Sequence, residues 1–581
     1  MTPADALAGG DAGDGGPADD LAGGDGGRAG DTDDLAVGTH AAGGADLAGW
    51  PSIPALTAAA ADRFGDRVAI TDGATTLTYA ELLEEARSFG AALVAGGIEP
   101  GDRVAIWAYN CAEWVVALLG LFQAGAVLVP VNTRFKGIEA ADVLVRSRAR
   151  LLVTVTDFLG TDYVALLDGA GVDLPDLETV VVAHGPRPDR APGRTRARSW
   201  ADFTARATAA DRDEVARRAA AVGTDDPSDI LFTSGTTGVP KGVVQTHGRT
   251  LRVATDWVAM TGLTAGDRYL MVNPYFHMFG LKAGILASVA AGATMLPEAV
   301  FDVDRVLARV ADERVTVLPG APTLYQALLD HPDRGRHDLS SLRVAVTGAA
   351  DIPVALIRRI DDELPFSVVV TGYGLTEGGT AAATSPGDDV ETIATTVGRP
   401  RPGFELRIAD DKGAEVAAGE TGEILLRGPS IMAGYLDDPE ATAEALDADG
   451  WLRTGDLGVV GEDGCLRIVG RAKDMFIVGG FNAYPAEIEN FLLRHPDVAQ
   501  AAVIGIPDAR LGEVGMAFVV TRPGAPATAP EIIAWCRENM ANYKVPRAVE
   551  IVDELPLNAT GKVAKNELRS RAATTAPAAP R

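Results

Sequence analysis

The chain has 581 residues, 47% of them hydrophobic and 23% charged, with a formal net charge of −28 at pH 7. This length exceeds what one hydrophobic core usually organises, so we expect more than one domain. The strong negative charge argues against nucleic acid or an anionic membrane surface as a partner.

Residues 1–49 are a mixture of Gly, Ala and Asp with almost no aromatic or β-branched residues. Such a segment cannot bury enough apolar surface to offset its ordering entropy, so we predict that it is disordered. It also lacks a basic region followed by an apolar run, which predicts a cytoplasmic protein without a secretory signal.

The most apolar stretch, Trp114 to Val131, is interrupted by Gln123 and Pro130. It predicts a buried helix followed by a buried strand, and no stable membrane insertion. The cysteines lie far apart without metal-ligand spacing, which predicts reduced thiols in or near hydrophobic cores. They are Cys111, Cys465 and Cys536.

Strand-like apolar runs alternate with amphipathic helical stretches up to about residue 400. The strand-like runs are Val104 to Trp107, Leu151 to Val155, Val180 to Val182, Val315 to Leu318 and Val344 to Thr347. This alternation predicts an α/β fold with largely parallel, buried sheets. Short strands between Gly and Asp turns follow, as at 404–408 and 423–427, and predict a β-rich subdomain.

A change in composition near Arg471–Asp474 predicts a domain boundary. We expect a large domain over 50–472 and a small, mobile α+β domain over 473–570. Tyr484-Pro485 opens a helix of the small domain, since proline suits a first helical turn. Residues 571–581 are rich in Ala, Thr and Pro and are predicted to form a second loose end.

Hydroxyl and glycine residues follow an apolar strand between Leu231 and Gly242 and are closed by a lysine. They are Thr233, Ser234, Gly235, Thr236, Thr237, Gly238 and Lys241. Glycines let backbone N–H groups approach an anion, hydroxyls add donors, and lysine supplies charge, which suits phosphates. The spacing is not that of the common P-loop, because glycine follows the lysine.

This loop resembles the phosphate loop of the adenylate-forming superfamily, which includes acyl-CoA synthetases, peptide-synthetase adenylation domains and firefly luciferase. The resemblance spans about residues 52–570, and further motifs follow in the family's order. It implies that the loop residues bind ATP and that Thr233 is catalytic.

Tyr373-Gly-Leu-Thr-Glu377 is the second motif. A tyrosine face can stack on adenine, a hydroxyl can bond a phosphate, and a carboxylate can hold Mg²⁺. The resemblance implies these roles for Tyr373, Thr376 and Glu377, with Gly374 also lining the nucleotide. Gly348, Ala349 and Ala350 resemble the family's turn beside the adenine and acyl site.

Trp451 to Asp456 is the third motif, and a carboxylate at its end can accept bonds from both ribose hydroxyls. The resemblance implies that Asp456, helped by Arg471, binds the ribose. It also implies a hinge at Lys473, about which the small domain rotates after adenylation. Gly479 and Gly480 resemble the loop that then lines the channel for the pantetheine arm.

Leu555-Pro-Leu-Asn-Ala-Thr-Gly-Lys562 ends the series of motifs. By resemblance, Lys562 is the catalytic lysine that bridges the substrate carboxylate and ATP. Attack of a carboxylate on the α-phosphorus brings two anions together, so a positioned cation is what this step needs.

The segment Asn273 to Gly280 resembles one wall of the family's acid pocket. It has Phe276-His277 where amino-acid-activating domains usually have an aspartate, which disfavours an amino acid substrate. His277 corresponds to a residue between the acid pocket and the thiol channel. Lys282 lies in an apolar run and has two interpretations: a side chain reaching solvent, or a contact to a substrate oxygen far from the carboxylate.

The sequence therefore predicts an AMP-forming acid–thiol ligase that uses ATP, Mg²⁺ and coenzyme A, with Lys562, His277, Thr233 and Glu377 as catalytic residues. Longer stretches resemble actinobacterial ligases for a steroid-derived bicyclic propanoate, and medium-chain or cyclic fatty acids are the next candidates. An enzyme that loads a carrier-protein thiol, a luciferase-like oxygenase and a nucleotide-binding regulator are the alternatives. The oligomeric state stays open, with a homodimer among the options.

Overall fold

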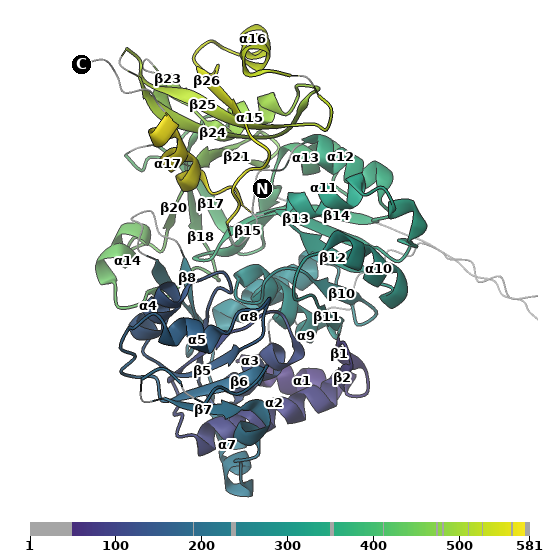
Figure 1. Cartoon of the computed structure of the whole chain (residues 1–581), viewed down its shortest axis with the longest axis vertical. Helices are drawn as coiled ribbons and strands as arrows, with labels where there is room; N and C mark the ends of the chain where they lie inside the picture. The colour runs from purple at the N-terminus through teal and green to yellow at the C-terminus, as the bar shows by residue number, and fades with distance from the viewer. Residues whose placement is uncertain are drawn as a thin grey trace, which may run out of the picture. The chain divides into compact units, whose positions relative to one another are not determined.

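The computed structural model describes residues 49–575, except 190, 194, 234–239, 349–351, 353, 411, 472–473, 479–480, 509, 526 and 559–561 (Figure 1). The segment 1–49, predicted to be disordered, lies outside the described residues except for Gly49. The described residues form one compact unit.

An eight-stranded sheet carries the first half of the chain, in the order β19-β9-β8-β4-β3-β5-β6-β7. Strands β3 to β8 are mutually parallel. At one edge, β9 is antiparallel to both of its neighbours, β8 and β19. The predicted α/β architecture is confirmed. The strands are β3 (Arg103–Trp107), β4 (Val127–Pro130), β5 (Ala149–Val155), β6 (Thr179–His184), β7 (Arg196–Ser199), β8 (Pro227–Thr233), β9 (Lys241–Thr246) and β19 (Gly434–Tyr435).

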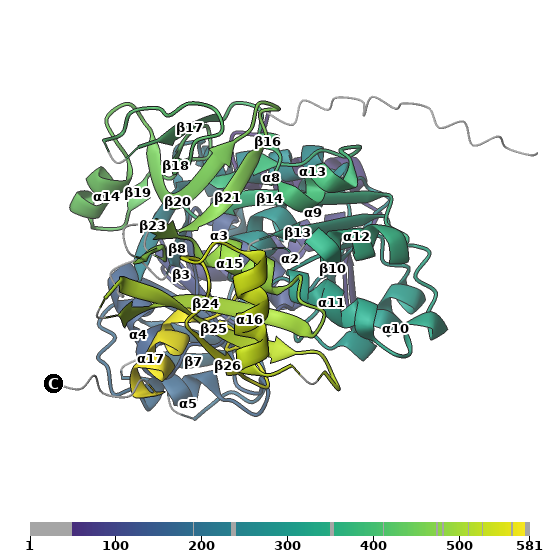
Figure 2. The same ribbon diagram turned by 90° about the horizontal axis from the view of Figure 1, so that it is seen from above.

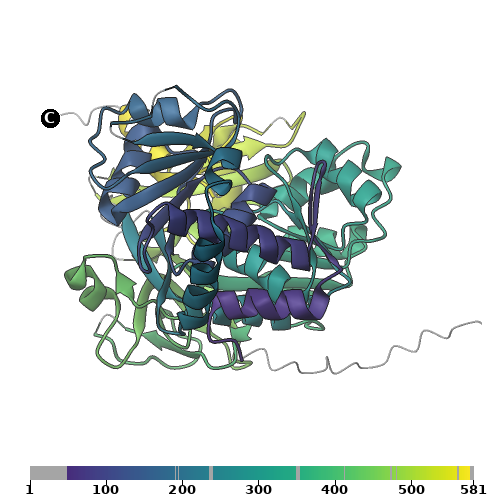
Figure 3. The ribbon, with the colours of Figure 1, turned by 90° about the horizontal axis from the view of Figure 1, so that it is seen from below.

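Helix α3 (Ala112–Gln123) is buried along nearly its whole circumference and leads into β4, as predicted from its apolar sequence. It packs on α2 (Tyr79–Ala95), which lies beside α1 (Ile53–Phe64) in purple in Figure 3. The other helices of this half are α4 (Gly137–Ser147), α5 (Tyr163–Asp168), α6 (Trp200–Thr204) and α7 (Ala209–Ala221). No described helix is long and apolar enough to cross a membrane.

A nine-stranded sheet follows, in the order β16-β15-β14-β13-β12-β10-β11-β1-β2. Its central strands are parallel, and antiparallel strands flank them on both sides. The strands are β1 (Val68–Asp72), β2 (Thr75–Thr78), β10 (Arg268–Met271), β11 (Thr294–Pro297), β12 (Val317–Gly320), β13 (Val344–Gly348), β14 (Val368–Leu375), β15 (Gly379–Ala383) and β16 (Arg399–Pro400).

The helices of this second sheet include one π-helix, η1 (Phe279–Leu286), whose wider turn is uncommon and is frequently found at functional sites. It runs directly into α9 (Ala287–Ala291). The remaining helices are α8 (His247–Thr261), α10 (Val303–Glu313), α11 (Pro322–Asp330), the 3₁₀ turn η2 (Arg334–Arg336), α12 (Val354–Glu363) and α13 (Val390–Thr395).

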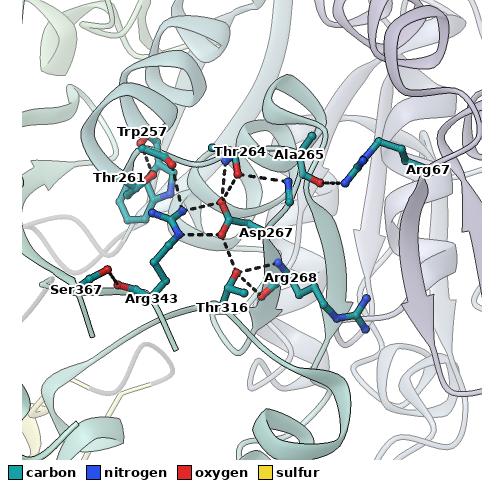
Figure 4. A network of polar contacts seen from close by, with 12 residues as sticks. Arg67, Trp257, Thr261, Thr264, Ala265, Asp267, Arg268, Thr316, Arg343 and Ser367 are labelled. Atoms are coloured by element: carbon teal, nitrogen blue, oxygen red, sulfur yellow. Dashed lines mark hydrogen bonds and ion pairs between the residues drawn. The ribbon is translucent and has the colours of Figure 1, made fainter. Parts of the chain in front are cut away.

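A buried carboxylate, Asp267, ties together the starts of three strands of this sheet (Figure 4). It accepts hydrogen bonds from the Thr316 hydroxyl (2.8 Å), the Thr264 amide (2.8 Å) and the Arg343 guanidinium (2.6 Å). Burial raises the pKa of Asp267, but the hydrogen bonds from Arg343 and Thr316 outweigh burial and hold that pKa below its usual value. The carboxylate therefore stays ionised and fixes the register at this end of the sheet.

Four antiparallel strands form a third sheet, in the order β17-β18-β20-β21 (Figure 2). They are β17 (Glu405–Ala409), β18 (Gly422–Arg427), β20 (Leu452–Val460) and β21 (Leu466–Arg471), with α14 (Pro439–Ala445) between β18 and β20. The predicted change to short strands after residue 400 is confirmed.

The last sheet has five strands and helices on both faces. The strands are β22 (Phe476–Val478), β23 (Phe481–Ala483), β24 (Val498–Asp508), β25 (Gly512–Thr521) and β26 (Ala548–Ile551). In β24, Val503 packs with α15 (Pro485–Leu492) and α16 (Ala529–Asn539), whereas Ala502 and Ile504 pack with α17 (Lys565–Thr575). Neighbouring residues of a strand point to opposite faces, so both faces are covered.

The chain end differs from its prediction, because α17 continues to Thr575 and residues 571–575 are not a loose tail. Leu568 and Ala572 lie one helical turn apart and are both buried against the sheet, which stabilises the last turns of the helix. The prediction for the cysteines is confirmed: Cys111, Cys465 and Cys536 are free and buried.

Candidate active site

The two ends of the phosphate-loop motif are adjacent in the structure. Thr233 ends β8, Lys241 begins β9, and the two residues pair across the antiparallel ladder. The loop residues Ser234, Gly235, Thr236, Thr237 and Gly238 lie outside the described residues. Strand β8 is parallel to β4, so Thr233 lies at the carboxyl edge of the sheet, where α/β folds commonly bind ligands.

Lys241 lies against the Tyr435 ring, with its Nζ 4.9 Å from the ring centroid. The Tyr435 hydroxyl donates a hydrogen bond to Oε1 of Glu377 (3.1 Å). Burial and, next, the Glu377 carboxylate raise the pKa of Tyr435, so the phenol keeps its proton. Through this tyrosine, the structure joins the lysine of the phosphate loop to the carboxylate of the second motif.

Gln245 of β9 also holds the second motif. Its side-chain amide donates to the backbone oxygens of Thr376 and Ser430, both at 3.3 Å. Because Gln245 is on the strand that Lys241 opens, this contact keeps Thr376 and Glu377 beside the phosphate-loop strands.

Asp456 is the meeting point of the second and third motifs. Its Oδ2 accepts a hydrogen bond from the Tyr373 hydroxyl (2.7 Å), and its Oδ1 lies 2.8 Å from Nε of Arg471. Asp456 and Arg471 are opposite each other on β20 and β21. Burial, followed by the Asp456 charge, raises the pKa of Tyr373 well above its usual value. Three residues predicted to hold the adenosine therefore lie together.

At two glycines of the predicted nucleotide site, a side chain would clash at one and be crowded at the other. A Cβ on Gly374 would lie 2.3 Å from the backbone oxygen of Gly379, and one on Gly348 would lie 3.0 Å from that of Gly372. Strands β13 and β14 pair at Gly348 and Gly372. Ala349 and Ala350, which follow, lie outside the described residues.

The segment predicted to form a wall of the acid pocket is held by Asn110. Its side-chain amide donates to the backbone oxygens of Met271 (2.8 Å) and Asn273 (2.9 Å), and its oxygen accepts from the Tyr275 N–H (2.9 Å). A Cβ on Gly280 would lie 2.2 Å from the Pro274 backbone oxygen, so only glycine fits this tight turn into η1.

His277 is half-buried in this segment, and its Nδ1 accepts a hydrogen bond from the Phe279 N–H (3.2 Å). Burial and, second, the charge of Lys562 lower the pKa of His277 to about 4. The imidazole is therefore neutral at pH 7, and the ammonium of Lys562 is within electrostatic range of it.

The loop of Lys562 also contacts the first half of the chain. The Arg134 guanidinium donates to the backbone oxygen of Asn558 (3.1 Å), while the Asn558 side chain accepts from the Lys562 N–H (2.9 Å). The Arg134 contact ties the C-terminal lysine loop to the segment after β4, and the charge of Lys562 acts on His277, although the two residues are more than 280 positions apart.

Lys282 is buried, and its Nζ lies 2.9 Å from Oδ1 of Asp229 in β8. The side chain is 1% exposed, so the interpretation that it reaches solvent is wrong. The ion pair connects η1 to the strand that ends at Thr233. The predicted contact of Lys282 with substrate stays a prediction.

The predicted hinge and thiol channel lie outside the described residues, which include neither Lys473 nor Gly479 or Gly480. The flanking strands are described: β21 ends at Arg471 and β22 begins at Phe476.

Two family models match the chain. One, described as AMP-binding enzyme, covers residues 57–436, and one described as AMP-binding enzyme C-terminal domain covers residues 487–562. The chain belongs to the AMP-binding enzyme family.

Two similar relatives are named as ligases that join 3-(7a-methyl-1,5-dioxo-octahydro-1H-inden-4-yl)propanoate to CoA. The Rhodococcus jostii protein is 49% identical over 520 residues, and the Mycobacterium tuberculosis protein is 51% identical over 519. Each alignment covers 89% of this chain and 98% of the relative. The solved structure of the anthranilate CoA ligase AuaEII with anthranoyl-AMP has a TM-score of 0.81 at 31% identity, covering 90% of this chain and 97% of that one.

Several residues that build this candidate site carried no signal in the sequence. Tyr435, Gln245, Asn110 and Asp229 are single polar residues outside the motifs, and each acts through a partner far along the chain. Only the polar character of Gln245 and Asp229 within apolar strand sequences could have drawn attention to them.

Proposed function

We propose that this protein is an ATP-dependent carboxylic acid:CoA ligase that forms an acyl-adenylate and then an acyl-CoA. The observation that carries the proposal is a set of contacts between motifs in a member of the AMP-binding enzyme family: Lys241 and Glu377 meet through Tyr435, Asp456 binds Tyr373, and the charge of Lys562 acts on His277. The named CoA ligases among its relatives support CoA as the acceptor.

The nucleotide would lie along the carboxyl edge of β8. The loop from Thr233 to Lys241 would bind the phosphates, while Tyr373 and Asp456 would hold the adenosine. Asp456 is suited to the ribose hydroxyls, because an ionised carboxylate only accepts hydrogen bonds. Its present donors, Tyr373 and Arg471, keep it oriented before a ligand arrives.

Glu377 would hold Mg²⁺, which supplies charge neutralisation on the phosphate oxygens when it is bound. The residue fits this role because its carboxylate is half-buried and oriented by Tyr435, whose ring also contacts Lys241. Mg²⁺ prefers carboxylate and phosphate oxygens and is usually bound by one or two protein carboxylates.

In the first half reaction, a carboxylate oxygen attacks the α-phosphorus, the bond to the bridging oxygen breaks, and pyrophosphate leaves. Lys562 would lie beside both anions and stabilise the charge that develops between them. Removing one such preorganised group typically costs about 10²–10³ in rate, or about 3–4 kcal/mol. Neutral His277 suits a position beside this lysine, since a second cation would compete for the same anions.

In the second half reaction, the CoA sulfur attacks the acyl carbonyl, AMP leaves, and the thiol proton is released. We propose that Lys473 is the pivot that carries Lys562 away from the site, and that Gly479 and Gly480 then line the thiol channel. A proline at position 473 should impair acyl transfer more than adenylation.

The acid proposed for this chain is a bicyclic diketone propanoate, of the class named for the Rhodococcus and Mycobacterium relatives. The alignments with these two relatives cover almost their whole length at about half identity, so they include the acid-pocket segment 273–280. This segment contains aromatic and apolar residues around His277, which suits an apolar acid.

The test is a screen of pyrophosphate release with ATP and Mg²⁺, using the bicyclic propanoate, medium-chain fatty acids and an amino acid, each with and without CoA. We expect release with the bicyclic acid and an acyl-CoA product by mass spectrometry. Absence of pyrophosphate–ATP exchange with every acid would refute the ligase. Adenylation that yields no acyl-CoA when CoA is supplied would favour a carrier-protein acceptor.

A further inference from the structure

Three potential metal ligands meet away from the residues assigned to the nucleotide. Cys111 precedes α3, Glu113 lies in its first turn, and His184 is the last residue of β6. The thiol sulfur, a carboxylate oxygen and an imidazole nitrogen all lie within 4.8 Å of one another. Among the described residues, this is the one group of three such side chains so close together.

The geometry is within reach of tetrahedral coordination. Zn–S bonds of about 2.3 Å and Zn–N or Zn–O bonds of about 2.0–2.2 Å place neighbouring ligand atoms about 3.4–3.6 Å apart. Nε2 of His184 now lies 2.7 Å from Oε2 of Glu113, a hydrogen-bonded pair that would open by less than about 1 Å. Small side-chain rotations suffice.

The surroundings favour a cation. Asp72 and Asp157 are within electrostatic range of His184, so three carboxylates including Glu113 surround one imidazole. Arg309, the guanidinium that acts on Asp72, is already bound to Glu298 (2.7 Å) and Glu313 (2.5 Å). A bound divalent ion would compensate this excess of negative charge.

The ligands are also positioned and accessible in the way a metal site requires. The Tyr109 ring stacks on the His184 imidazole, with centroids 5.6 Å apart, and orients it. Cys111 is 1% exposed, whereas the side chains of His184 and Glu113 are 32% and 25% exposed. Two of the three ligands are therefore partly open to solvent, and the thiol is buried.

We propose that Cys111, Glu113 and His184 bind a thiophilic divalent cation of the Zn²⁺ type, with a fourth position for water. A thiolate and an imidazole select such ions over Mg²⁺, which prefers oxygen ligands, so this site is distinct from the one that Glu377 would provide. A bound ion would join the β3–α3 turn to the end of β6.

The proposal extends to the acid pocket through one neighbouring residue. Asn110, next to Cys111 in the chain, holds the backbone of residues 271–275. An ion on Cys111 would stiffen the turn from which Asn110 reaches this segment. The site does not depend on the proposed ligase activity, since its residues lie outside the catalytic assignments.

The experiment uses the untagged full-length protein, freed of metal with a chelator and titrated with Co²⁺. We expect one equivalent to produce a thiolate-to-cobalt charge-transfer band, which persists in excess Mg²⁺ and disappears when Zn²⁺ displaces the cobalt. Cys111→Ser should remove the band. His184→Gln should weaken Co²⁺ binding by about tenfold or more. Tenfold is the smallest loss of affinity expected, because even groups that only support the ligands of a metal site typically contribute about 10–100-fold.

Cys465→Ser and Cys536→Ser are the matched controls, because these thiols are also buried and should leave the band unchanged. His184→Gln changes a partly exposed strand end, so it keeps the test valid if Cys111→Ser does not fold. A wild-type protein without the band, or a band that survives in folded Cys111→Ser, would overturn the proposal and leave a hydrogen-bonded cluster only.

Discussion

Lys282 and Asp229 form an ion pair with Nζ and Oδ1 2.9 Å apart, and their side chains are 1% and 0% exposed. The pair joins a π-helix beside the acid pocket to the strand that carries the phosphate loop. The Ser228 hydroxyl (2.6 Å) and the Thr250 hydroxyl (2.7 Å) donate to the other carboxylate oxygen. The proposed acid and nucleotide halves of the site are therefore joined by a buried ion pair.

Replacing Lys282 with leucine should destabilise the protein strongly, because it leaves the Asp229 charge buried without its partner. Breaking one side of a buried ion pair costs about 3–5 kcal/mol. The measurement is the free energy of unfolding by denaturant, with Lys282→Leu/Asp229→Asn as the matched control that should recover much of the loss.

The same variant separates structure from substrate binding. If Lys282 also contacts a substrate oxygen, Lys282→Leu should reduce kcat/KM for keto-acids more than for plain fatty acids. The double variant should show the same preferential loss for keto-acids, because it still lacks the lysine. Equal losses for both acid classes would mean that the lysine acts only through Asp229.

Lys562→Ala should abolish acyl-AMP formation and leave thioester formation from supplied acyl-AMP largely intact. The loss expected from one missing cation is about 10²–10³ in the adenylation rate. Lys565→Ala is the control, because this neighbouring lysine is paired with Glu489 at 2.7 Å and lies outside the proposed site. Equal damage to both half reactions would contradict the role given to Lys562.

The imidazole of His277 should stay neutral down to about pH 4, as burial and Lys562 lower its pKa. The folded pKa lies below the ordinary value of 6.5. The contribution of this histidine to the free energy of unfolding is therefore greatest above pH 6.5 and decreases as the pH falls toward 4. NMR titration of the histidine side chains should show no His277 transition near neutrality.

Lys562→Ala should raise the pKa of His277 without bringing it to 6.5, since burial is the larger cause. His247 is the internal control: burial lowers its pKa to about 4 as well, but Lys562 does not act on it. An unchanged His277 pKa in the variant would place Lys562 away from this histidine in solution.

Asp267→Asn should lower the free energy of unfolding by about 3 kcal/mol, the low end for a broken buried pair, because Arg343 is one-third exposed. The pKa of Asp267 is lowered on folding, so its contribution is present above the unfolded value and lost as the pH falls through the folded value. Denaturant unfolding at pH 7 and at pH 5 should show the same difference in the free energy of unfolding between wild type and variant. This difference should shrink below pH 3.8, the ordinary pKa of the group. A difference that grows on acidification would contradict this.

Features confined to one stretch of chain were accessible from the sequence. The buried helix and strand of Trp114 to Val131, the helix opened by Pro485 and the change to short strands after residue 400 all follow from local periodicity. The α/β class was predicted because strand-like and helical patterns alternate along the chain. The family was predicted because the residues of each motif are contiguous. The end of α17 was missed, since Ala572 packs against the sheet, and composition alone does not show this tertiary contact.

The pairing of distant side chains was decided by the tertiary structure alone. Tyr435 reaches Glu377 across 58 positions, Tyr373 reaches Asp456 across 83, and His184 reaches Glu113 across 71. Strand order sets these meetings, and no local pattern encodes strand order. For the same physical reason, Lys282 seemed from the sequence to be a surface or substrate lysine: its countercharge lies on another strand, and only the fold brings the two together.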